Sequence, residues 1–244
     1  MKTFFQNGCP KNTTLKWWPA DTEERFNLHL KTQKSLLNRL RWNKESITYT
    51  FDQYGFRNSE NINTSNVYNL VLGCSHTFGV GVNESDVWYN VLKRKFDEPF
   101  YNAAIAGGSI GGCYRSLTGL INNGLKVKRI FMLTPGRDRN EFFNTTEQKW
   151  QTAAYWSVLD KPILKLYLEE NSLENFYQTN LLAIKHICKE NNIELIDIPT
   201  DDDNQIDYAI GKCCKARDLS HPGITTQLFL GKKFYEEYCK RYNR

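Results

Sequence analysis

Short apolar runs separated by amphipathic stretches recur along the chain. The clearest run, Val67–Leu72, ends abruptly at Gly73. It is too short for an independent helix and is bounded by glycine, so it predicts a buried strand. Further strands are expected at 47–51, 100–105, 128–134 and 193–199.

Helical spacing of apolar residues fills the intervals between these strands. Ser85 is a candidate N-cap for a helix that Pro99 stops, and Ser109 is a candidate cap for a helix that contains Gly111 and Gly112. Such glycines lower helix propensity but permit close packing. The remaining helices are expected from Thr145 or Thr146 to Leu159, from Asn171 onward, and from Ile224 to Tyr242.

Strands that alternate with helices predict a parallel sheet with helices on both faces. We therefore expect a three-layer α/β/α sandwich with a mainly parallel, flavodoxin-like sheet. With 244 residues, the chain suits one such domain over residues 67–244, preceded by an N-terminal extension, residues 1–66, that packs on it. The bulky Trp17-Trp18-Pro19 turn is expected to anchor that extension on the domain surface.

Charge and cysteine content narrow the class of protein. The formal net charge of +5 comes from basic residues scattered among acidic ones, which favours solvated faces over nucleic-acid binding. No apolar stretch is long enough to span a bilayer, and the first residues lack a signal-peptide core, so a cytoplasmic protein without membrane contact is expected. The seven cysteines show no zinc-binding spacing, so free thiols, no metal and no cofactor are expected.

Candidate chemistry lies at the two ends of the predicted domain. Ser75 follows the first apolar run, at the strand end where active sites collect in α/β sheets. Near the C-terminus, Asp218 precedes His221 by three residues, a spacing that lets the acid hold one ring nitrogen. Serine, aspartate and histidine together supply the three roles of a nucleophilic triad.

Three segments resemble the conserved blocks of the SGNH (GDSL-type) hydrolases. Gly73–Gly79 is similar to the first block, with Cys74 replacing the usual aspartate. Asn102–Ser109 resembles the second block, and Asp218–Pro222 resembles the last. The resemblance implies a Ser75–His221–Asp218 triad, with the Ser75 and Gly107 amides in the oxyanion hole.

The third block departs from the family pattern. Where SGNH proteins place Gly-x-Asn, this chain has Thr134–Asn140, so Asn140 is a tentative oxyanion donor. Arg137 and Arg139 are alternative donors from the same loop. A Gly-Phe-Arg element ahead of the serine also resembles the family, so Arg57 either braces the active-site side or is an exposed turn arginine.

The resemblance implies a serine esterase that hydrolyses an O-acyl ester of a small molecule or carbohydrate. An acyltransferase of the same fold and a catalytically weak binding or structural module are the alternatives. The aromatic segment 141–178 is either a lid or sugar-stacking wall, or a flap that covers the sheet. The sequence leaves the oligomeric state open.

Overall fold

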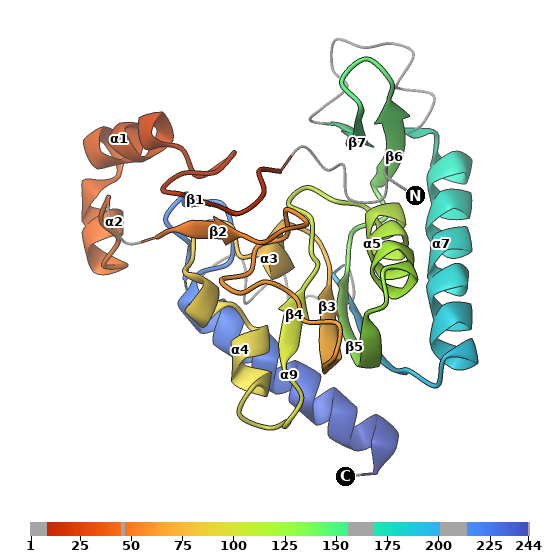
Figure 1. The fold of residues 1–244 in the computed structure, drawn as a ribbon. Coiled ribbons are helices and arrows are strands. Elements are labelled where there is room, and N and C mark those ends of the chain that lie inside the picture. The colour runs from red at the N-terminus through yellow and green to blue at the C-terminus, as the bar shows by residue number, and fades with distance from the viewer. Residues whose placement is uncertain (1–8, 45–46, 156–167, 201–213, 244) are drawn as a thin grey trace.

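The computed structural model describes residues 9–44, 47–155, 168–200 and 214–243 (Figure 1). Within these ranges, a central sheet of four parallel strands has the order β4-β3-β5-β8. The strands are β3 (Val67–Leu72), β4 (Phe100–Asn102), β5 (Lys126–Thr134) and β8 (Glu194–Pro199). The chain starts in the middle, adds one neighbour, and then crosses to the other side, as in a flavodoxin-like sheet.

Side chains of the central strands alternate between two hydrophobic clusters. Leu70 and Leu72 of β3 belong to one cluster, whereas Val71 belongs to the other. The same alternation divides Ile130 from Phe131 on β5, because successive side chains of a strand point to opposite faces. The sheet is therefore buried on both faces, which a parallel sheet requires.

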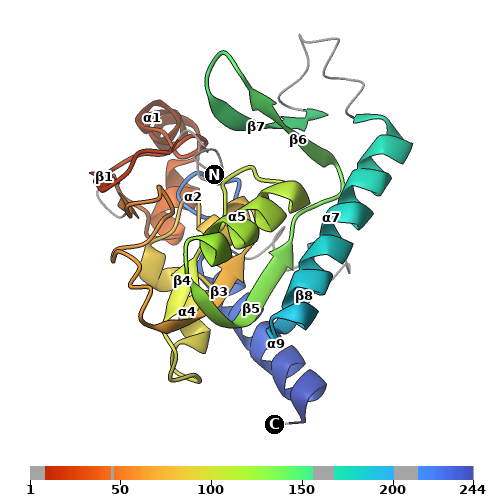
Figure 2. The ribbon, with the colours of Figure 1, turned by 45° about the vertical axis from the view of Figure 1, so that its right-hand side comes forward.

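Helices cover both faces of the sheet. Helices α5 (Ile110–Asn122) and α7 (Glu170–Glu190) pack on one face. Helix α9 (Ile224–Tyr242), with the short α4 (Tyr89–Leu92), covers the other (Figure 2). The predicted three-layer α/β/α sandwich is confirmed. Within the described ranges, no helix is long and apolar enough to cross a bilayer.

The segment before β3 forms elements of its own. Strands β1 (Thr13–Leu15) and β2 (Tyr49–Phe51) pair in antiparallel fashion. Between them lie α1 (Glu23–Thr32) and α2 (Lys34–Arg39). Side chains of α1 and β2 belong to the same buried cluster as side chains of α9, so this segment contributes to the main core.

The helix expected after Ser85 is wrong. The region instead holds a 3-10 turn, η1 (Glu84–Asp86), and the four-residue α4. The backbone N–H of Trp88 donates to Gln227 Oε1 of α9 at 3.0 Å, so a tertiary bond replaces a helical one. The apolar residues that suggested a helix are buried individually against α9, as Trp88 stacked on Phe234 shows.

The helix expected from Thr145 or Thr146 is also wrong, although its last residues, 156–159, lie outside the described ranges. The chain forms a hairpin of β6 (Arg139–Asn144) and β7 (Lys149–Ala154), which stands above the strand ends in Figure 1. Asn144 Oδ1 accepts from the N–H groups of Thr146 and Glu147 at 3.0 and 3.1 Å. This side-chain turn reverses the chain where a helix cap was expected.

Helix boundaries elsewhere agree more closely with the sequence. Ser109 Oγ accepts from the Gly112 N–H at 3.3 Å and caps α5, as expected. Helix α9 has the predicted limits. Helix α7, however, begins at Glu170, so Asn171 lies in its first turn and does not cap it. Glu169, Glu170 and Asn171 are all polar, so the sequence pattern does not show at which of them the helix begins.

Candidate active site

Residues that follow each of the four central strands in the sequence line one cavity of about 560 Å³. Ser75 follows β3, Gly107 follows β4, Arg139 follows β5 and His221 follows β8. The remaining lining residues are Trp18, Pro19, Ala20, His76, Val80 and Ala106. The sheet topology thus brings Ser75 and His221, which lie 146 positions apart, to the same cavity.

Ser75 is the first residue of α3 (Ser75–Phe78), a single helical turn directly after β3. Its carbonyl accepts from the N–H groups of Gly79 and Val80 at 3.0 and 3.2 Å, which closes the turn. No hydrogen bond from the Ser75 N–H to another described residue is present. Ser75 therefore lines the cavity and carries an unused backbone donor. Cys74 is buried and does not line the cavity.

Asp218 and His221 form a tight pair. Asp218 Oδ2 lies 2.6 Å from His221 Nδ1, while Asp218 Oδ1 accepts from the backbone N–H groups of Ser220 and His221, each at 3.1 Å. Burial raises the pKa of Asp218, but its hydrogen bonds and charge interaction with His221 outweigh burial and lower it. The carboxylate thus stays ionised and fixes the orientation of the His221 imidazole, with Nδ1 toward the acid and Nε2 away from it.

Ser75 and His221 line the same cavity, but no hydrogen bond joins the Ser75 hydroxyl to the imidazole of His221 in this structure. In enzymes without substrate, such bonds are often long and tighten only when a substrate binds. The structure therefore brings the three predicted triad residues to one place and forms one of the two expected contacts.

His76, which the sequence analysis did not single out, lines the same cavity. Its ring meets that of His221 edge-on, with 5.9 Å between the ring centroids. Burial, followed by the charges of His221 and Arg139, lowers the pKa of His76 to about 3. Its Nδ1 atom is buried and has no hydrogen-bond partner among the described residues. His76 is therefore neutral near pH 7 and adds no charge beside His221.

Gly107 presents its backbone to the cavity. Its φ of +73° lies in the left-handed region that glycine adopts without strain. A Cβ built on it meets no atom within 4 Å, so the space beside it is open. Its N–H donates to no other described residue. Gly107 therefore offers a second unused donor at the cavity.

The third-block loop places one arginine at the cavity and one away from it. Arg139 lines the cavity and donates to Asp138 Oδ1 and the Gly108 carbonyl at 3.2 and 3.3 Å. Burial lowers the pKa of Arg139, but Cys74 and Asp138 outweigh burial and raise it, so the guanidinium stays charged. Arg137 instead pairs with Glu174 on the outer surface, where both side chains are about half exposed.

Asn140, the tentative oxyanion donor, lies outside the cavity lining. Its side chain is buried, and Oδ1 accepts from the Glu141 N–H at 2.8 Å. Glu141 in turn makes a buried two-bond contact with Arg115 of α5, each bond 3.2 Å long. Gly111 of α5 permits this approach, since a Cβ there would lie 3.1 Å from Glu141 Oε1. The hairpin that carries Arg139 is thus fixed on α5.

Arg57 braces the turn that carries Ser75. Its guanidinium is fully buried and donates to the carbonyls of Phe78, Gly79, Thr48 and Val82. Burial lowers its pKa, which reflects the cost of holding the charge inside the protein. The alternative reading of Arg57 as an exposed turn residue is wrong. The turn after Ser75 is held by a buried cation that contacts mainly backbone oxygens.

Among the described residues, no cluster of three or more metal-ligating side chains is present.

No protein-family model matches the chain, and no curated protein matches it. Several solved structures are similar to the chain. One is TesA, which has a TM-score of 0.45 and 15% identity over 70% of this chain and 97% of that one.

Two further solved structures are similar to this chain. The psychrotrophic esterase EstA from Pseudoalteromonas sp. has a TM-score of 0.38 and 18% identity, over 73% of this chain and 100% of that one. A lipolytic G-D-S-L family protein from Veillonella parvula has a TM-score of 0.37 and 17% identity, over 70% of this chain and 97% of that one.

Proposed function

We propose that this protein is a serine esterase that hydrolyses an O-acyl ester of a small molecule. The observation that carries the proposal is the Asp218–His221 pair, 2.6 Å apart, opening onto the same cavity as Ser75. A serine that stands beside an imidazole oriented by a buried carboxylate has the arrangement of an activated nucleophile.

The residues suggest the following course of reaction. Ser75 Oγ attacks the ester carbonyl carbon while His221 Nε2 takes the hydroxyl proton, because Nδ1 is held by Asp218. His221 then gives this proton to the alcohol oxygen as the C–O bond breaks, which leaves an acyl group on Ser75. A water molecule, deprotonated by His221, releases the acid and restores the hydroxyl of Ser75.

Charge that develops on the carbonyl oxygen needs donors aimed at it. The unused N–H groups of Ser75 and Gly107 border the cavity, and the charged Arg139 lies on the same border. We assign Arg139 the place of the third donor, which Asn140 does not fill because it lies outside the cavity lining. Donors already in position stabilise the tetrahedral intermediate without rearranging during the reaction.

Acyl transfer is the alternative outcome of the same chemistry. If an alcohol rather than water attacks the acyl group on Ser75, the protein is a transferase with an identical first half-reaction. The identity of the ester, including the carbohydrate ester that the family resemblance implies, follows from a substrate screen with both water and sugar hydroxyls as acceptors.

The test is hydrolysis of p-nitrophenyl acetate together with labelling by a fluorophosphonate, which modifies activated serines. The wild-type protein should turn over the ester and take one label, at Ser75. Ser75→Ala should lose both, whereas Ser85→Ala, at an exposed serine of η1 outside the cavity, should keep both. Absence of Ser75-dependent turnover and labelling would reject the esterase and favour a binding module.

A further inference from the structure

The tight turn at residues 18–21 (the 18–21 turn) belongs to the N-terminal segment but lies at the cavity. Trp18, Pro19 and Ala20 line the cavity together with Ser75 and His221. The backbone N–H of Trp18 donates to the Asp21 carbonyl at 3.2 Å, and that of Asp21 donates to the Trp18 carbonyl at 2.8 Å. These reciprocal bonds hold the turn closed, so its apolar edge has a fixed position.

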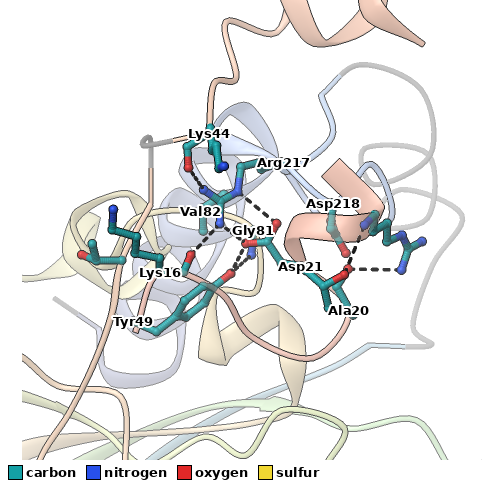
Figure 3. A network of polar contacts seen from close by, with 12 residues as sticks. Lys16, Ala20, Asp21, Lys44, Tyr49, Gly81, Val82, Arg217 and Asp218 are labelled. Carbon is teal, nitrogen blue, oxygen red and sulfur yellow. Dashed lines mark hydrogen bonds and ion pairs between the residues drawn. The ribbon is translucent and has the colours of Figure 1, made fainter. Parts of the chain in front are cut away.

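The 18–21 turn is attached to the segment that carries His221. Asp21 and Arg217 form a buried ion pair through two bonds of 3.0 and 2.7 Å, and Arg217 directly precedes Asp218 (Figure 3). Arg25 donates both to the Ala20 carbonyl and to Ser220 Oγ, next to His221. Two separate contacts thus place the turn on the His221 side of the cavity.

The packing of Trp18 fixes how the turn bounds the cavity. Its ring stacks on Phe78 at 5.5 Å between centroids and tilts against Phe51 at 4.8 Å. A ring packed against two buried aromatic side chains resists displacement by a larger group. Trp18 is therefore a packed boundary of the cavity.

The chemistry of ester cleavage says which part of an ester meets this boundary. The carbonyl oxygen faces the donors, here from Ser75, Gly107 and Arg139. The alcohol oxygen faces His221, because His221 returns the proton to it. The alcohol portion of the ester accordingly extends toward the side of the cavity on which the 18–21 turn lies.

We propose that the 18–21 turn is the alcohol-binding wall and limits the size of the alcohol that the protein accepts. The expected substrates are esters whose alcohol presents a compact apolar face to Trp18 and Ala20. This inference rests on the esterase function proposed above. It assigns a specificity-determining role to the N-terminal segment, which supplies none of the reacting groups.

The test compares two pairs of esters in kcat/KM. Phenyl acetate and 2-naphthyl acetate differ only in the alcohol, whereas phenyl acetate and phenyl butyrate differ only in the acyl group. Trp18→Ala, which enlarges the cavity, should raise the naphthyl-to-phenyl ratio at least about fivefold and leave the butyrate-to-acetate ratio within about twofold. Ala20→Leu, which narrows the cavity, should lower the naphthyl-to-phenyl ratio by a similar factor.

Trp17→Ala is the matched control, since Trp17 packs on Phe26 and on Arg217 and does not line the cavity. It should change neither ratio, whatever its effect on the absolute rate. Ser75-dependent hydrolysis in which neither Trp18→Ala nor Ala20→Leu alters the alcohol ratio, or in which the acyl ratio changes instead, overturns the inference alone. Absence of Ser75-dependent hydrolysis by the wild-type protein overturns the esterase function and this inference with it.

Discussion

Asp21 and Arg217, 196 positions apart in the chain, form a buried ion pair beside the candidate active site (Figure 3). Their side chains are 1% and 0% exposed. Arg217 also donates to the carbonyls of Lys16 and Lys44 at 3.0 and 2.9 Å, and Asp21 Oδ2 accepts from the Tyr49 hydroxyl. The hydrogen bonds of both charges are thus well satisfied, which a buried ion pair requires to be stable.

Arg217→Met should destabilise the protein by about 3–5 kcal/mol, because it leaves the Asp21 carboxylate buried without its partner charge. The free energy of unfolding from urea titration measures this loss. The double variant Asp21→Leu with Arg217→Met should lose less than Arg217→Met alone, since it removes both charges. A double variant less stable than Arg217→Met would contradict this account of the pair.

The exposed ion pair of Arg137 and Glu174 provides a control for charge removal. Its side chains are 54% and 45% exposed, so solvent screens the interaction. Arg137→Gln should therefore change the free energy of unfolding by less than about 1 kcal/mol. An equal loss for Arg137→Gln and Arg217→Met would mean that burial does not decide the contribution of these pairs.

The sequence predicted the sheet because buried parallel strands appear as apolar runs, such as Val67–Leu72. It also singled out Ser75 and His221, which line one cavity, because residue type and spacing carry that signal locally. The region from Ser85 to Pro99 was predicted incorrectly because local periodicity cannot register a bond such as that from Trp88 to Gln227, 139 positions away. Tertiary contacts override helix propensity in short segments.

The N-terminal contribution to the cavity was likewise beyond local patterns. The Trp17-Trp18-Pro19 turn was expected to anchor the extension, but nothing in its sequence indicates contact with residues after β8. Asp21 and Arg217 are separately unremarkable charges, and only the fold brings them together. Arg139 was one of three loop residues among which spacing could not choose, because the loop forms an unexpected hairpin.

Removal of the Arg139 side chain should slow catalysis. Arg139→Ala should lower kcat on p-nitrophenyl acetate by about 10²–10³ with KM little changed, as loss of one oxyanion donor does. Arg137→Ala and Asn140→Ala are the matched controls from the same loop, and kcat should stay within about threefold for both, because neither side chain lines the cavity. A decrease in kcat for Asn140→Ala but not for Arg139→Ala would restore Asn140 as the donor.

Replacement of Arg57 by lysine should test the brace under the Ser75 turn. Arg57 donates to four backbone carbonyls from its two terminal nitrogen atoms, and an ammonium group cannot reach all four. Arg57→Lys should therefore lower the free energy of unfolding by about 1.5–3 kcal/mol for each bond lost. Arg39→Lys, at an exposed position of α2, should be nearly neutral, and a comparable loss there would show that the Arg57 result is not specific to its buried bonds.

The lowered pKa of His76 predicts a specific pH dependence of stability. The folded protein keeps His76 neutral down to a pKa of about 3, whereas the unfolded chain takes up a proton near pH 6.5. Between these values the unfolded state binds more protons, so stability falls as the pH falls. The contribution is fully present above about pH 6.5 and is progressively lost below it, by at most about 1.4 kcal/mol per pH unit.

Urea titrations of wild-type protein and His76→Asn at pH 7.0, 6.0, 5.0 and 4.5 measure this effect. All four pH values lie above the ordinary pKa of an aspartate, and the fold lowers the pKa of Asp218 further. The loss of unfolding free energy caused by protonation of Asp218 therefore occurs below pH 4.5. The free energy of unfolding should decline less steeply in His76→Asn than in the wild type, and His186→Asn, at an exposed histidine of α7, should keep the wild-type slope. Parallel declines for the wild type and His76→Asn would show that His76 takes up its proton equally in the folded and unfolded states, and that the cavity does not hold it neutral.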